Sequence, residues 1–116
     1  MTKFLNPENL PYPKYGLNPG VATNGYVFAG GMALDLYKLE RLPEADTIAA
    51  ETKLCLKEIE GILEAAGCTL RDVVKTTCYL SDDAYRAEFW QAYTEVFAGD
   101  CRVEIDAIAV RPQARP

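Results

Sequence analysis

The chain has 116 residues, of which 49% are hydrophobic and 25% are charged, and its formal net charge is -5. This length is typical of one domain with its own core, so we expect a single domain over residues 1–116. The acidic balance argues against a nucleic-acid partner, because proteins that bind phosphate backbones usually carry a basic face. No basic-then-apolar leader and no apolar run of about 20 residues is found, so we expect a cytoplasmic protein that does not associate with membranes.

The sequence contains no histidine, which excludes Ser–His and Cys–His catalysis and any histidine general base. Catalysis would then rest on carboxylates, Arg or Lys, hydroxyls, thiols, backbone groups and water. The four cysteines, at positions 55, 68, 78 and 101, form no C-x-x-C pair. A zinc site would need all four thiolates from scattered elements, so we expect neither a metal nor another cofactor.

Residues 6–20, in the N-terminal arm at 1–20, hold four of the seven prolines of the chain. Proline fixes φ and donates no ladder hydrogen bond, so this stretch predicts an extended, irregular N-terminal arm. Two interpretations stay open. The arm packs on the body through residues such as Tyr12 and Tyr15, which the sequence favours, or it forms the rim of a ligand pocket.

A strand is predicted at Tyr26–Ala29, because an apolar run follows the turn signal Asn24-Gly25. The paired glycines Gly30 and Gly31 end this run and allow close approach of another backbone or of a ligand. Apolar periodicity and terminal residues then predict the remaining elements. They are a second strand at 32–36, a loop at 37–44, a helix at 47–66, a strand at 73–80, a helix at 84–97 and a strand at 101–110. Charged residues of the first helix, including Glu51 and Glu58, are interpreted as a solvated face.

The predicted order β-β-α-β-α-β indicates an α+β fold with both helices on one face of a mixed sheet. The opposite face still carries apolar residues and needs a cover, which copies of the chain can supply. Side chains alternate between faces along a strand, so Glu104 and Asp106 share the uncovered face with Ile108. An unpaired carboxylate is rarely buried, and Glu104 and Asp106 should therefore lie at a rim, a pocket or a subunit boundary.

Three segments together resemble the RidA family, also called YjgF or endoribonuclease L-PSP-like, over about residues 20–110. They are VFAGG at 27–31, LEAAGCTLRDVVKTTCYLSD at 63–82 and RVEIDAIAVR at 102–111. The resemblance implies a chorismate-mutase-like protomer and a homotrimer with ligand clefts between subunits. It also implies a hydrolase that deaminates enamine or imine intermediates to 2-oxo acids and ammonia.

The resemblance also implies site residues. Glu104 matches the glutamate that handles the water, and Gly31 matches the middle glycine of a Ser-Gly-Gln segment that lines the cleft. The glutamine of that segment is Met32 here. Tyr15 loosely echoes a Gly-Pro-Tyr-Ser segment, and Trp90 stands where the family often has asparagine. These residues are expected to bind the substrate.

One family element has no match in the sequence. The family has a further strand, with a Pro-Ala-Arg motif that grips the substrate carboxylate, where only residues 98–102 separate Phe97 from Val103. Either the protein lacks this strand, or a segment between Gly99 and Cys101 is missing from the sequence. Arg102 is the nearest candidate replacement, and a purely structural role for it is the alternative. The missing arginine keeps open a second function, a trimeric small-molecule binder without turnover.

Overall fold

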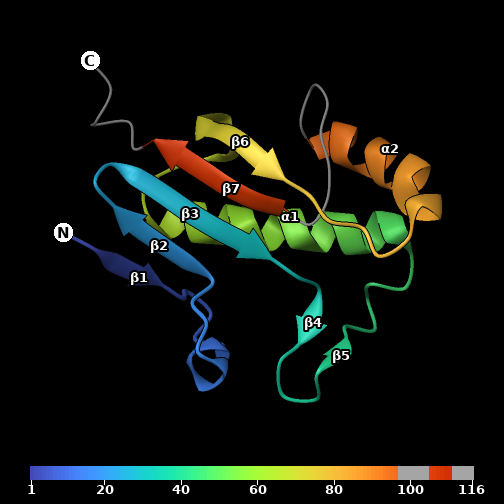
Figure 1. The fold of residues 1–116 in the computed structure, drawn as a ribbon, viewed down its shortest axis with the longest axis horizontal. Coiled ribbons are helices and arrows are strands. Elements are labelled where there is room, and N and C mark those ends of the chain that lie inside the picture. Colours follow the sequence, from blue (N-terminus) through green and yellow to red (C-terminus); the bar gives the residue numbers. More distant parts are fainter. Residues whose placement is uncertain (97–104, 111–116) are drawn as a thin grey trace.

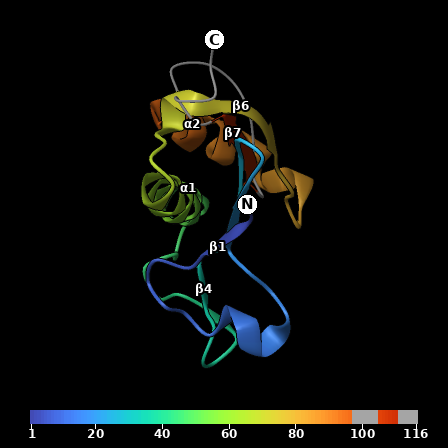
Figure 2. The ribbon, with the colours of Figure 1, turned by 90° about the vertical axis from the view of Figure 1, so that its left-hand side faces the viewer.

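The computed structural model describes residues 1–96 and 105–110 (Figure 1). Five strands form one sheet in the spatial order β1-β2-β3-β7-β6, and two short strands form a separate hairpin. The elements are β1 (Lys3–Leu5), β2 (Gly20–Thr23), β3 (Tyr26–Gly31), β4 (Leu34–Asp35), β5 (Glu40–Arg41), α1 (Ile48–Ala65), β6 (Val73–Thr77), α2 (Arg86–Val96) and β7 (Ile105–Val110). The predicted α+β class is confirmed, and α1 lies on one side of the sheet (Figure 2). Helix α2 is on the same face, because Phe89 and Tyr93 join the core that α1 forms with the sheet.

Every described strand pairing is antiparallel, so the sheet is not mixed as expected. The helix-crossover connection explains the difference. Strand β3 leads through α1 to β6, but β7 inserts between these two strands and pairs with both. Strands β3 and β6 therefore run in the same direction without being neighbours. The last strand is described only from Ile105, and residues 101–104 of the predicted strand lie outside the described residues.

The N-terminal arm contributes an edge strand, which the sequence did not predict. Strand β1 pairs with β2, and β2 pairs with β3 through the predicted Asn24-Gly25 turn. Both turn residues have positive φ, 51° at Asn24 and 82° at Gly25, which is the backbone of a tight two-residue hairpin. The prediction was right about the turn and about the irregular segment at 6–20, which has no strand before Gly20. It missed the strands β1 and β2 on either side, because short strands are defined by their partners more than by composition.

The segment after β3 folds into a hairpin of its own. Strand β4 pairs with β5, with Leu34 opposite Arg41. The expected loop at 37–44 is therefore partly wrong, because Glu40 and Arg41 are paired. The hairpin is fixed to the body at its base, where the Leu42 N–H donates to the Ala33 carbonyl at 2.9 Å.

Helix α1 covers the inner face of the sheet, close to its predicted bounds. The side chain of Thr47 accepts the Ala50 N–H at 3.0 Å and caps the first turn, and Gly67 follows the helix with φ of 77°. The core joins buried residues of α1 to small and apolar residues of the strands. These are Leu56, Ile59, Ile62 and Leu63 of the helix and Leu5, Ala22, Val27, Ala29, Ala107 and Ala109 of the sheet.

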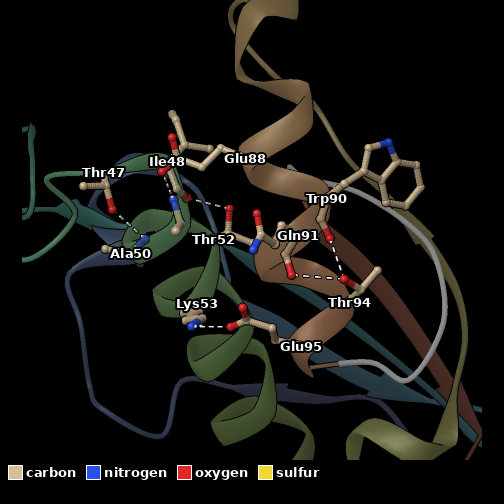
Figure 3. A network of polar contacts seen from close by, with 11 residues as sticks. Thr47, Ile48, Ala50, Thr52, Lys53, Glu88, Trp90, Gln91, Thr94 and Glu95 are labelled. Atoms are coloured by element: carbon tan, nitrogen blue, oxygen red, sulfur yellow. Dashed lines mark hydrogen bonds and ion pairs between the residues drawn. The ribbon is translucent and has the colours of Figure 1, made fainter.

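Helix α2 lies against α1 and adds Phe89 and Tyr93 to the same core. Polar contacts join the two helices at their exposed side (Figure 3). The Ala49 N–H donates to the Glu88 carboxylate at 3.0 Å, and Lys53 forms a salt bridge of 2.6 Å with Glu95. Glu88 thus supplies one of the acceptors that the first turn of α1 needs. None of the described helices is long and apolar enough to span a bilayer.

No described helix covers the opposite face of the sheet, where four apolar residues and one lysine form a row across the five strands. The registers place Phe4 beside Val21, Val21 beside Phe28, Phe28 beside Ile108 and Ile108 beside Lys75. Phe4 is 64% exposed and Phe28 is 43% exposed. We call these five residues the open-face row. An apolar surface of this extent on one side of a sheet is typical of an interface between subunits.

Candidate functional site

The end of β3 at Gly31 is the point on which the candidate site is built. Gly31 is buried and pairs with Ile105, so the end of β3 and the start of β7 lie side by side (Figure 1). A Cβ atom added to Gly31 would lie 2.5 Å from the Cys55 carbonyl oxygen of α1. The close approach that the sequence predicted at this glycine is therefore an approach to a helix backbone, and only glycine allows it.

Two adjoining cavities open at this end of the sheet, and we call them together the Gly31 groove. The inner cavity has a volume of about 450 Å³ and is lined by Gly31, Met32 and Cys55 among others. The outer cavity has a volume of about 510 Å³ and extends to Thr47 and Ile48 at the start of α1. Both cavities are lined by five common residues, Arg41, Glu51, Tyr79, Leu80 and Ser81. The β4–β5 hairpin, the first turns of α1 and the segment after β6 thus enclose both cavities as one continuous space.

Glu58 of α1 supports the backbone at the mouth of this groove. Its carboxylate accepts hydrogen bonds from the Tyr12 hydroxyl and from the Met32 N–H. Burial raises the pKa of Glu58, and these two hydrogen bonds oppose the shift. Burial, followed by the hydrogen bond to Glu58, also raises the pKa of the Tyr12 hydroxyl. The prediction that Glu58 belongs to a solvated face is wrong, because the arm covers it.

A family model described as Endoribonuclease L-PSP matches residues 8–111 of the chain. The chain belongs to the RidA/YjgF/L-PSP family. A RutC family protein of Synechocystis is 32% identical over 127 residues, covering 95% of this chain and 97% of the relative. That span exceeds the 116 residues of this chain, so the relative has residues with no counterpart here.

Solved structures of the RidA/YjgF/L-PSP family share the fold. A member of the YjgF/YER057c/UK114 family from Mycobacterium tuberculosis has a TM-score of 0.75 and 24% identity, over 95% of this chain and 99% of its own. The E. coli protein TdcF, solved with bound serine, has a TM-score of 0.76 and 21% identity, over 94% of this chain and 98% of its own. The family and the α+β fold of the protomer expected from the sequence are confirmed.

Tyr15 lies in the N-terminal arm and does not line the groove within the described protomer. Its hydroxyl donates to the Leu36 carbonyl of the β4–β5 turn at 2.8 Å, and the side chain is 37% exposed. Together with the Tyr12–Glu58 contact, this supports the packed-arm interpretation. The pocket-rim interpretation stays open, because Pro19 of the arm lines two other cavities, of about 250 and 400 Å³. Tyr15 fixes the hairpin on which Arg41 is carried, and its contact with substrate stays a prediction for the assembled protein.

Trp90 of α2 lines a different cavity, on the other side of the segment after β6. This cavity has a volume of about 590 Å³ and includes Asp83, Arg86 and Leu80. Leu80 lines both this cavity and the Gly31 groove, so it forms the partition between them. The indole points away from the polar contacts that join α1 and α2 (Figure 3). Gly31 and Met32 therefore line the Gly31 groove, as predicted for a shared site, whereas Trp90 lines the neighbouring cavity.

Two further predicted residues, Arg102 and Glu104, lie outside the described residues. The sequence also missed two residues that the fold places in the groove, Arg41 and Glu51, because each read as an ordinary solvated charge. Their separation in the sequence matches no known motif, because Arg41 belongs to strand β5 and Glu51 to helix α1. Among the described residues, no group of three His, Cys, Asp or Glu side chains is arranged to hold a metal ion.

Proposed function

We propose that this protein hydrolyses 2-imino acids, and the enamines in equilibrium with them, to 2-oxo acids and ammonia. The observation that carries the proposal is the pairing of Gly31 with Ile105 at the mouth of the Gly31 groove. Glu104 precedes Ile105, and consecutive Cα atoms are about 3.8 Å apart. The residue that matches the family's catalytic glutamate is therefore the sequence neighbour of the residue that pairs with the cleft glycine. Membership of the RidA/YjgF/L-PSP family supports the same activity.

The chemistry needs positioning and one proton relay. A protonated imine carbon is already electrophilic, so water adds to it, a C–O bond forms and the C=N electron pair moves to nitrogen. In this proposal Glu104 accepts the proton of the attacking water and then delivers it to the nitrogen of the carbinolamine. The C–N bond breaks and ammonia leaves, while the hydroxyl gives its proton to the Glu104 carboxylate and the C=O bond of the 2-oxo acid forms. The proton on Glu104 then passes to the released ammonia or to water. An enamine enters the same path after a proton adds to its β-carbon.

The proposed assembly is a homotrimer in which the open-face rows of three copies cover one another. The row is apolar from Phe4 to Ile108, and water exposure of such a surface is unfavourable by about 25 cal/mol per Å². A cavity of about 400 Å³ lies on the same face, lined by Phe28, Gly30, Lys75 and Thr77 among others. A second subunit seated on the row would close this space and extend the groove into a cleft between subunits.

The test is the release of ammonia from a 2-imino acid generated freshly in the assay by oxidation of an amino acid. The protein should accelerate the release over buffer and over the same protein after heat denaturation. Equal rates in all three samples would overturn the proposal. Intact RNA incubated with the protein is a parallel sample. The net charge of -5 disfavours binding of a phosphate backbone, so the RNA should stay uncut.

A second candidate function is a binder of small carboxylic acids without turnover. It is favoured by the absence of a Pro-Ala-Arg motif from the sequence and by the bound serine in TdcF. Trp90 is the sole tryptophan, and it shares the Leu80 partition with the groove. Binding without turnover would change its fluorescence on titration with 2-oxo or aromatic acids while the rate of ammonia release stays at the buffer level.

A further inference from the structure

The inner cavity of the Gly31 groove contains one positive and one negative side chain. Among the described residues that line it, Arg41 and Glu51 are the only charged ones. The rest of the lining is apolar, hydroxyl-bearing or backbone, from residues such as Met32, Tyr79 and Ser81. A small site with a single cation and a single anion is complementary to a ligand that carries both charges.

The position of Arg41 is set by the hairpin. Its backbone pairs with Leu34, and the next residue, Leu42, donates to the Ala33 carbonyl at 2.9 Å. Ala33 comes two residues after Gly31 in the chain and is buried. The turn of the hairpin is held in addition by the Tyr15 hydroxyl on the Leu36 carbonyl. The guanidinium is thus carried on a paired strand, next to the segment that contains Gly31 and Met32.

Neither Arg41 nor Glu51 is held by another charged side chain in the described part of the chain, although Glu51 lies in the first turn of α1, where a carboxylate favours the helix. Two other carboxylates, Asp46 and Glu88, line only the outer cavity. Glu88 is occupied, because it accepts the Ala49 N–H. Within the described residues no salt bridge occupies either charge of the inner cavity, and Arg41 is exposed, so both charges can meet a ligand.

We propose that Arg41 binds the carboxylate of the substrate and that Glu51 faces its protonated nitrogen. This inference rests on the proposed function and names the residues that select the substrate class. A guanidinium offers a planar fork of donors that matches a carboxylate, which an isolated ammonium does not. A carboxylate near the imine nitrogen favours the protonated and electrophilic form of the substrate. The 2-oxo acid product has lost the positive nitrogen and keeps only the contact with Arg41.

The test uses three stable probes of similar size and follows the backbone amide signals of Gly31 and Met32 by NMR titration. Alanine carries both charges, alaninamide carries only the positive charge and propionate carries only the negative charge. Arg41→Leu should weaken the binding of alanine and propionate by about ten-fold or more and leave alaninamide unchanged. Glu51→Gln should weaken alanine and alaninamide and spare propionate. Arg41→Lys should fall between wild type and Arg41→Leu, because the charge is kept and the fork is lost.

Matched controls are Arg71→Leu and Glu60→Gln, which remove the same charges from exposed positions outside the groove. Both should bind all three probes as wild type does. Unchanged alanine affinity in Arg41→Leu, the same loss in Arg71→Leu, or no alanine binding by wild type would overturn the inference. Imine hydrolysis that persists in Arg41→Leu with unchanged KM would overturn this inference and leave the proposed function standing. If alanine binding depends on Arg41 but wild type hydrolyses no imine, the proposed function is overturned and the binding role of Arg41 stands.

Discussion

The hydroxyl of Tyr12 donates a hydrogen bond to the carboxylate of Glu58, although 46 residues separate them in the chain. The same carboxylate accepts the Met32 N–H, so one side chain of α1 joins the N-terminal arm to the mouth of the Gly31 groove. The arm is therefore part of the site's support. Changes at Tyr12 or Glu58 should affect the groove even though neither residue lines it.

Replacing Glu58 by Gln should alter how stability depends on pH. Burial raises the pKa of Glu58 above its ordinary value of 4.5, so the folded protein binds this proton more tightly than the unfolded chain. The stabilising contribution is fully present below pH 4.5 and is lost as the pH rises through the raised pKa. The free energy of unfolding of wild type should therefore fall relative to Glu58→Gln across this window. Denaturant unfolding at a series of pH values measures the difference.

The control for Glu58→Gln is Glu60→Gln, which removes a carboxylate from an exposed position of the same helix. A difference between wild type and Glu58→Gln that stays constant between pH 4 and pH 8, or that grows in favour of wild type, would contradict the burial of this carboxylate by the arm.

Gly31→Ala should destabilise the protein by about 1–3 kcal/mol, because overpacking forces neighbouring atoms to move. The added Cβ would lie 2.5 Å from the Cys55 carbonyl oxygen, and a helix backbone does not yield as a flexible side chain does. Gly61→Ala is the matched control, since its Cβ would meet nothing within 4 Å. In the interior of α1 that change should be neutral or stabilise by up to about 1 kcal/mol. Equal stability of the two variants in thermal unfolding would show that Gly31 is not in close contact with α1.

Phe28→Glu should convert the proposed trimer to a monomer. Phe28 lies at the centre of the open-face row, and a charge there would be buried without a partner in the interface. Sedimentation at micromolar concentration measures the change. The control is Tyr37→Glu, which alters a side chain that is 77% exposed in the β4–β5 hairpin. A wild-type protein that sediments as a monomer would end the trimer proposal, whatever the variants do.

Several elements of the fold follow from local chemistry and were predicted from the sequence. Asn24-Gly25 suits a tight hairpin, Gly67 suits a helix stop, and the apolar spacing of α1 and α2 suits packing on one face. The strands β1, β2 and β5 were missed. They have two to four residues each, and their pairing with distant partners decides their conformation.

The candidate site was predictable only where it coincides with a motif. Gly31 and Met32 belong to the segment that resembles the family, and the fold places both in the groove. Arg41 and Glu51 belong to no motif. Their significance appears only when the hairpin, α1 and the segment at Tyr79–Ser81 are seen to enclose one space. Glu58 was misassigned for a similar reason, because helix periodicity does not show that a distant arm covers a polar face.

The most direct test of the account is the initial rate of ammonia release from a freshly generated 2-imino acid with wild type, Glu104→Gln and the control Glu95→Gln. Glu95 lies on α2 in a salt bridge with Lys53, away from the groove. We expect wild type and Glu95→Gln to accelerate release equally and Glu104→Gln to lose about 100-fold or more of that rate, because a general acid–base group is removed. Acceleration that is undiminished in Glu104→Gln, or absent from wild type, would contradict the account.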